Sequence, residues 1–144
     1  MRIMGLDVGE KRIGVSLSDL LGYTAQGLCV IERRKLEYDL TRLREIITEH
    51  EVERLVLGMP YNMDGTMGWK AEEVKAFGDL LANEFGLPID YQDERLSTKA
   101  VEGTLIAADV SRKKRRQVVD KLAAVYILQG YLDSKARRQQ SRLD

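Results

Sequence analysis

Three acidic residues lie where a carboxylate is unusual. Asp7 ends a short apolar run, Glu94 follows another, and Asp120 lies in a segment with few other polar residues. A buried carboxylate is unfavourable unless a cation or hydrogen-bond donors compensate for its charge. If folding brings the three acids together, they repel one another and resist ionisation. Because Mg²⁺ and Mn²⁺ prefer oxygen ligands of this kind, the three residues predict a divalent metal site.

Such a site suits the hydrolysis of phosphodiesters, in which metal-activated water attacks phosphorus and the 3′-oxygen leaves. In many enzymes of this kind two ions about 3.5–4 Å apart stabilise the attacking and leaving oxygens. Each acid alone also has a structural explanation. Asp7 could cap a turn, Glu94 could belong to a solvated acidic turn, and Asp120 could pair with Arg116 on the same helix. Only their convergence favours the metal site.

A basic run precedes Asp120. The chain has 23 Lys and Arg against 23 Asp and Glu, so net charge does not indicate a nucleic-acid partner, but the local excess does. We interpret the run as a loop that holds a phosphate backbone, and the alternative is a solvated loop before a helix. A polyanion needs cations near an acidic centre, which favours the first interpretation. The run consists of Arg112, Lys113, Lys114, Arg115 and Arg116.

Several other classes of protein are disfavoured. A single cysteine, Cys29, excludes an internal disulfide, and with one histidine, His50, the chain offers no His/Cys cluster for zinc. It has no phosphate-binding loop motif. No apolar stretch approaches the roughly 20 residues that span a bilayer, and no signal-peptide pattern is present. We therefore expect a cytoplasmic protein that does not contact a membrane.

The hydrophobic pattern predicts an α/β domain that can hold these acids at one edge of a sheet. The first two strands form a hairpin, and the last two each follow a helix, so they add in parallel through right-handed crossovers. The simplest result is a five-stranded mixed sheet in the order 3-2-1-4-5, flanked by helices, in one domain over residues 1–144. Asp7 and Glu94 then share the edge where ligands gather. The expected strands are 2–8, 12–18, 27–32, 53–59 and 87–92, and the expected helices are 38–50, 69–85, 97–108 and 117–133.

Four motifs make the sequence similar to a known family. They are GLDVGEKRIGV at 5–15, VLGMPYNMDGT at 56–66, DERLST at 93–98, and VDKLAAV with the following ILQ at 119–129. In this order, over nearly the whole chain, they resemble the YqgF-type proteins. That family is described both as Holliday junction resolvases and as nucleases for the 5′ end of precursor 16S ribosomal RNA.

The resemblance implies a ribonuclease H-like fold and a role in ribosome maturation. It implies that Asp7, Glu94 and Asp120 are the catalytic acids and hold Mg²⁺ or Mn²⁺. Asn62, with the turn at 65–66, is expected at the same edge, either to contact phosphate or to shape the loop. Besides the basic run, the candidates for substrate binding are Lys11, Asn62 and Arg95.

Three functions fit these residues. The first is a metal-dependent nuclease for precursor ribosomal RNA. The second is a junction resolvase that acts on branched DNA, which normally requires a symmetric dimer because two related strands are cut. The third is a nucleic-acid-binding assembly factor without catalysis. We expect a monomer or a weak dimer, because the sequence contains no evident dimerisation helix.

Overall fold

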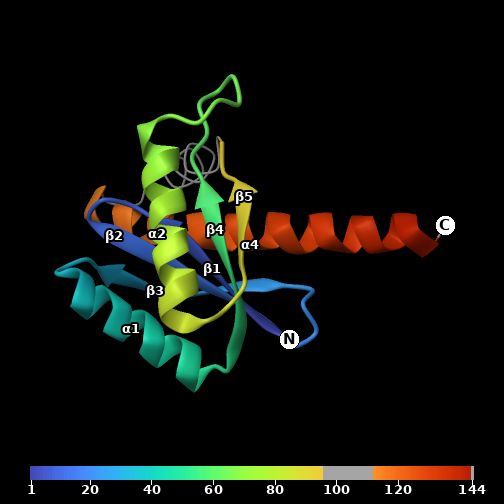
Figure 1. Cartoon of the computed structure of the whole chain (residues 1–144), viewed down its shortest axis with the longest axis horizontal. Helices are drawn as coiled ribbons and strands as arrows, with labels where there is room; N and C mark the ends of the chain where they lie inside the picture. The colour runs from blue at the N-terminus through green and yellow to red at the C-terminus, as the bar shows by residue number, and fades with distance from the viewer. Residues whose placement is uncertain (96–111, 144) are drawn as a thin grey trace.

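Five strands form one mixed sheet in the order β3-β2-β1-β4-β5 (Figure 1). The computed structural model describes residues 1–95 and 112–143, and within the last helix it describes the side chains of residues 118–139. The first three strands pair antiparallel, and β4 and β5 add in parallel. Strand order and directions confirm the prediction from sequence. The strands are β1 (Arg2–Val8), β2 (Arg12–Ser18), β3 (Ala25–Glu32), β4 (Val52–Met59) and β5 (Ile89–Asp93).

The described helices are α1 (Leu36–Glu49), α2 (Trp69–Phe85) and α4 (Arg112–Leu143). Helix α2 ends at the predicted Gly86, whose φ of 65° is left-handed and whose N–H donates to the Ala82 carbonyl. The helix expected at 97–108 lies outside the described residues.

The last helix is longer than predicted. The expectation of a helix over 117–133 after a charged loop was wrong, because α4 begins at Arg112 and continues to Leu143. Residues 112–116 therefore form its first turns. Hydrophobic periodicity marks only the part of a helix that packs on the core, whereas Lys, Arg and Gln support a helix without leaving that mark.

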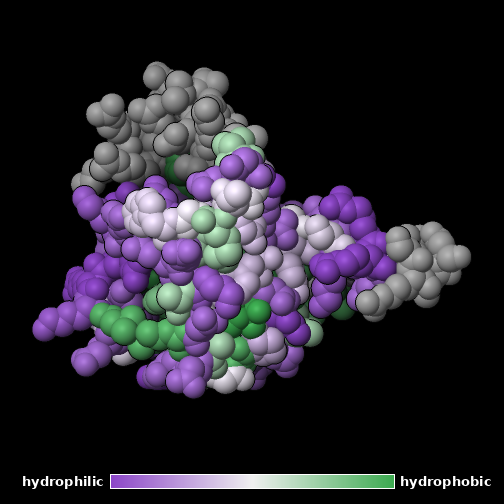
Figure 2. Space-filling view, turned by 45° about the horizontal axis from the view of Figure 1, so that its top comes forward, coloured by the Kyte–Doolittle hydropathy of each residue, from purple (hydrophilic) through white to green (hydrophobic). Residues whose placement is uncertain are grey.

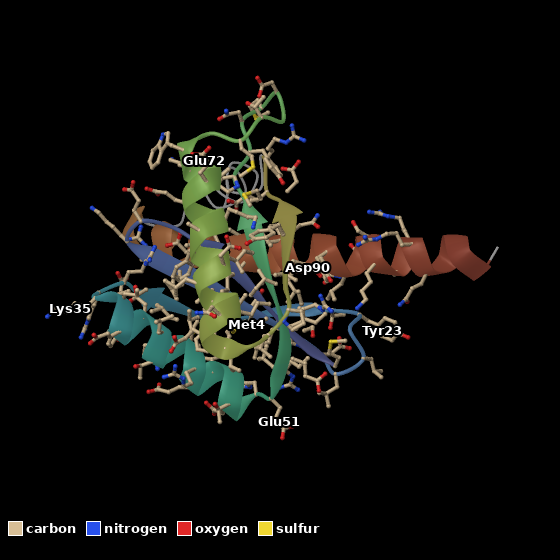
Figure 3. The ribbon with its side chains drawn as sticks, viewed as in Figure 1. Met4, Tyr23, Lys35, Glu51, Glu72 and Asp90 are labelled. Carbon is tan, nitrogen blue, oxygen red and sulfur yellow. The ribbon has the colours of Figure 1, made fainter. Side chains whose placement is uncertain are left out.

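The sheet lies between two helical layers (Figure 1). Side chains alternate across each strand. Met4 and Leu6 of β1 join the core beneath α1 and α2, and Met4 lies behind α2 in Figure 3. Ile3 points the other way and packs with Ile127 and Leu128 of α4. The odd-numbered positions of β1, which include Asp7, therefore face α4.

Helix α4 approaches the sheet closely because β1 and β2 carry glycine where it crosses them. A Cβ on Gly14 of β2 would overlap the backbone carbonyl oxygen of Asp120. A Cβ on Gly5 of β1 would lie 2.7 Å from the Cβ of Leu128. Between these positions, the Ser16 hydroxyl donates to the Ala124 carbonyl at 2.7 Å. The glycines at positions 5 and 14 therefore allow α4 to pack this closely, and this packing determines the position of Asp120.

The face of the molecule shown in Figure 2 is mostly polar. In the view of Figure 2 hydrophilic residues cover most of the coloured face, and the hydrophobic ones gather mainly in a band in the lower half. No helix in residues 1–95 or 112–143 combines the length and the apolar character needed to cross a bilayer.

Replacing Gly14 with alanine should destabilise the protein by roughly 3 kcal/mol, because the added methyl forces α4 away from the sheet. Urea unfolding measures this change. Ala136→Ser, on an exposed position of the same helix, should change the free energy of unfolding by less than about 0.5 kcal/mol. Equal stabilities for Gly14→Ala and the parent protein would contradict the close packing.

Candidate active site

Asp7 lies on β1 opposite Gly14 of β2, and its side chain faces the α4 layer. Glu94 reaches it from the end of β5. The Glu94 amide donates to the Met59 carbonyl at 3.2 Å, which fixes Glu94 beside the end of β4. A Cβ on Gly58 would lie 2.6 Å from the Oε2 of Glu94, so this glycine leaves room for the carboxyl group. Three neighbouring strand ends thus bring the two acids together, as the topology predicts.

The two carboxyl groups share a hydrogen bond in a site largely removed from water. Burial raises the pKa of Asp7 to about 6, and the Asp120 charge adds to this rise, while the hydrogen bond with Glu94 opposes it. Burial, followed by the charge of Asp7, raises the pKa of Glu94 to about 8. Near pH 7 the pair therefore keeps about one proton, and full ionisation is unfavourable.

One oxygen of this pair has no hydrogen-bond donor among residues 1–95 and 112–143. The Oε2 of Glu94 is buried and receives no hydrogen bond from the residues that the structure describes. A buried oxygen without a donor is energetically unfavourable, and a second carboxyl beside it increases the negative potential. Both features fit a hard divalent cation, which takes carboxylate oxygens as ligands and would remove the repulsion. Asp7 and Glu94 are therefore the residues that could hold a metal.

Asp120 does not join the pair as a third close carboxylate. Its Oδ2 accepts a hydrogen bond from Nε of Arg12 on β2 at 2.6 Å. Its charge still raises the pKa of Asp7, so it lies within electrostatic reach. No group of three His, Cys, Asp or Glu side chains within the described ranges is arranged to hold a metal ion. The expectation that three acids gather in one cluster is corrected: two share a hydrogen bond and the third pairs with Arg12.

Arg12 is a site residue that the sequence patterns did not predict. Helical spacing indicated Arg116 as the partner of Asp120, whereas the structure pairs Asp120 with Arg12, 108 positions away. Arg12 was already part of the motif at 5–15, and its position at the start of β2 on the α4 face was the available signal.

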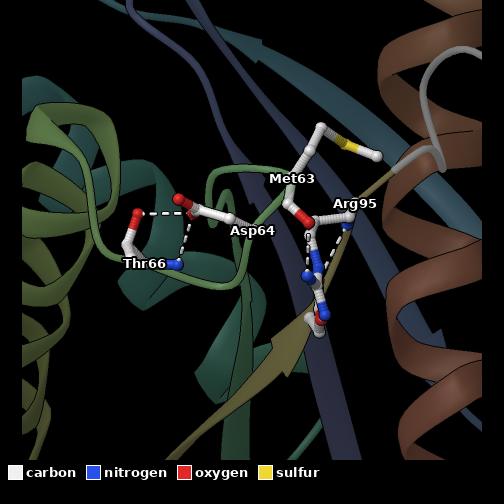
Figure 4. Close-up of polar contacts among 5 residues, drawn as sticks. Met63, Asp64, Thr66 and Arg95 are labelled. Atoms are coloured by element: carbon white, nitrogen blue, oxygen red, sulfur yellow. Dashed lines mark hydrogen bonds and ion pairs between the residues drawn. The ribbon is translucent and has the colours of Figure 1, made fainter.

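Asn62 shapes the loop after β4. Its side-chain amide donates to the hydroxyl of Thr66 at 3.0 Å, and its backbone N–H donates to the Thr66 carbonyl at 2.9 Å. The Asp64 carboxylate in turn accepts from the backbone N–H and the hydroxyl of Thr66 (Figure 4). Of the two roles left open for Asn62, the structure supports loop geometry.

Arg95 connects this loop to the end of β5. Its guanidinium pairs with Asp93 at 2.6 Å and donates to the Met63 carbonyl at 3.1 Å (Figure 4). Lys11 lies exposed at the β1–β2 turn. The basic residues 112–116 lie in the first turns of α4, and their side chains lie outside the described part. The structure therefore places Arg95 in a structural contact and leaves substrate binding by Lys11 and the basic run as predictions.

A five-stranded mixed sheet in the order β3-β2-β1-β4-β5, with helices on both faces, is the fold of the ribonuclease H-like class. Solved structures share this fold. They include Thermus thermophilus RuvC with a Holliday junction substrate, at 16% identity and a TM-score of 0.56 over 94% of this chain and 96% of that one. The fowlpox virus resolvase with Holliday junction DNA matches at 13% identity and 0.59, over 93% and 98%. These likenesses show the fold alone.

Within this class, the family model described as "RuvX: Holliday junction resolvase" matches residues 1–134, and the chain belongs to that family. A relative from Symbiobacterium thermophilum is 61% identical over 138 residues, covering 96% of each chain. One from Heliobacterium modesticaldum is 59% identical over 136 residues, covering 94% of this chain and 91% of the relative. Both carry the name "Putative pre-16S rRNA nuclease".

Without divalent ions, Asp7→Asn should stabilise the protein above pH 7 by about 1–3 kcal/mol. A carboxyl whose pKa is raised on folding binds more protons in the folded state, so stability falls as pH rises from about 4 to about 8. In the variant, the free energy of unfolding should decrease less over this pH range. Chemical unfolding with a chelator from pH 5 to 8 measures it, with the exposed Asp79→Asn as control. A variant less stable than the parent protein at pH 8 would exclude the repulsion between the two carboxyls.

Proposed function

We propose that the protein is a metal-dependent nuclease that hydrolyses phosphodiester bonds and processes the 5′ end of precursor 16S ribosomal RNA. The observation that carries this proposal is the partly buried Asp7–Glu94 pair at the sheet edge, with a Glu94 oxygen that has no donor among the described residues. The names of relatives about 60% identical over nearly their whole length supply the substrate. We assign this activity to one domain over residues 1–144 in the cytoplasm, acting as a monomer or a weak dimer.

Asp7 and Glu94 would hold Mg²⁺ or Mn²⁺. When bound, such an ion supplies a more acidic water and stabilises negative charge that develops at the phosphate. The two carboxyls must lose their shared proton to act as ligands, so affinity for the ion should rise with pH. The raised pKa values are consistent with a site that is completed by a cation.

Asp120 and Arg12 complete the site from helix α4 and strand β2. The ion pair with Arg12 fixes the direction of the Asp120 carboxylate. The charge of Asp120 acts on Asp7, so we include it as the third acid of the site. The close packing of α4 against Gly14 keeps this acid beside the sheet.

A junction resolvase is the second candidate. The family description names that activity, and two solved relatives of the same fold bind Holliday junctions, although their similarity shows only the fold. The same carboxylates would serve either substrate. A resolvase would cut two symmetry-related strands and would therefore act as a dimer on the junction.

Asp7→Asn should lower cleavage of a precursor 16S ribosomal RNA fragment at least roughly 10³-fold in Mg²⁺ or Mn²⁺, about 4 kcal/mol in transition-state stabilisation. Removal of one ligand should weaken ion binding while the fold persists, as checked by circular dichroism. Gel analysis of labelled RNA measures the rate, with Asp79→Asn as the matched acidic control. Activity retained in Asp7→Asn would refute the site assignment.

The same assay with a four-way DNA junction separates the candidates. Cleavage of the RNA and not the junction supports the proposed substrate. If a dimer makes paired cuts in the junction and leaves the RNA intact, the protein is a junction resolvase. RNA binding without turnover of either substrate in both metals would leave only an assembly factor.

A further inference from the structure

A cleft of about 920 Å³ opens beside the carboxylates, between the β1–β2 hairpin and helix α2. Glu94 lines one end of it, and Gly9 of the hairpin lines one wall. Besides the carboxylates of Glu10 and Glu73, three cations line it, namely Arg33, Arg34 and Lys70. The proposed function uses none of these cations, and no motif that supports the family resemblance contains them.

Arg33 is held rigidly in the wall of this cleft. Its Nε donates to Asp39 at 3.2 Å, and a terminal nitrogen donates to the Gly9 carbonyl at 2.7 Å. The guanidinium also lies 5.0 Å from the centre of the Phe77 ring. These two hydrogen bonds use only two of its five N–H donors. The group is therefore preorganised, which is the arrangement that planar recognition of a phosphate requires.

The carboxylate that holds the Arg33 guanidinium, Asp39, is buried. Its side chain is 1% exposed, and its second oxygen accepts from the Arg34 backbone N–H at 3.0 Å. One carboxylate thus orients both the Arg33 side chain and the Arg34 backbone. The Arg34 guanidinium lies 4.6 Å from the centre of the Tyr38 ring and remains exposed. Burial of a charge is unfavourable without partners, and the two contacts of Asp39 fix the Arg33 side chain and the Arg34 backbone beside the cleft.

An exposed aromatic residue lies one helical turn before residues that line the cleft. Trp69 is 58% exposed at the start of α2, with the Lys70 ammonium 5.6 Å from its ring centre. Helix positions 69, 73, 76 and 80 share one face, and the last three line the cleft. A large exposed aromatic beside cations is typical of surfaces on which unpaired bases stack.

We propose that this cleft binds a single-stranded segment of the RNA substrate, with Arg33 and Arg34 on its phosphates and Trp69 stacked on a base. The inference rests on the proposed function and adds the form of the substrate. Cations alone would hold a duplex or a single strand equally. A stacking platform selects single strands, because bases within a duplex are already stacked on one another. The cleft leads to Glu94, so a strand held there would reach the carboxylates.

The test uses binding without cleavage. Trp69 is the only tryptophan in the chain, so its fluorescence reports the cleft directly. With a chelator present, a 12-nucleotide single-stranded RNA should quench this fluorescence over the same concentration range in which its fluorescence anisotropy rises. A blunt duplex of the same sequence should bind at least roughly tenfold more weakly. Binding without quenching, or equal affinity for the duplex, would overturn the proposal.

Variants separate the two contacts. Trp69→Ala should raise Kd for the single strand roughly 5- to 100-fold, whereas Tyr23→Ala, an exposed aromatic in the β2–β3 connection, should not. Arg33→Gln should reduce the slope of log Kd against log salt by about 0.7. Arg44→Gln on α1, whose partner is Glu84, should change that slope far less.

Arg33→Lys keeps the positive charge, and it serves as a second test if Arg33→Gln does not fold. It should retain the salt slope but weaken binding, because it loses the bonds to Asp39 and Gly9. Unchanged affinity in Trp69→Ala and in both Arg33 variants would place the strand elsewhere. Cleavage of precursor RNA by the parent protein, measured separately, would then leave the proposed function standing.

Discussion

Helix α4 can lie against the sheet only because two strands lack side chains beneath it. At Gly14 the backbone of Asp120 occupies the space that a methyl group would need, and Leu128 does the same above Gly5. Protein interiors are packed to crystal-like density, so such a contact leaves little freedom for the helix. The direction of Asp120 and its pairing with Arg12 follow from this one contact, and so does the burial of the α4 face of β1.

Burial on that face explains the electrostatics of the site. Asp7 and Glu94 lie in surroundings that favour the neutral form of each carboxyl, and each makes ionisation of the other harder. A fold selected for stability alone would place apolar residues at these positions. Functional sites commonly retain groups that destabilise the protein without its ligand. Arg12 pairs with Asp120 and so offsets the negative charge of that residue, but it does not offset the repulsion between Asp7 and Glu94.

The sequence specified the architecture well because its signals are local. Alternation along residues 12–18, helical spacing along residues 69–85 and the terminal Gly86 each reflect one element and its immediate neighbours. Strand order then followed from connection length and handedness. The presence of Asp7 and Glu94 at a common edge followed from that order.

Other features could not be predicted because they depend on contacts between distant residues. Arg12 and Asp120 are far apart in sequence and meet only after α4 has packed. Burial of Asp39 depends on Arg33 and on a backbone group in the preceding loop, neither of which leaves a periodic pattern. The start of α4 was missed because residues 112–116 are helical without an apolar stripe.

The order of the elements also has a consequence for synthesis of the chain. β1 and β2, which supply the glycines and Asp7, are translated first, whereas the helix that covers them is translated last. Nascent chains that end before residue 112 contain the β1–β2 hairpin and the α1–α2 layer but lack α4, which packs on the other face of the sheet. The carboxylate site is therefore among the last parts of the molecule to be completed, and truncated chains would contain Asp7 without the Asp120–Arg12 pair beside it.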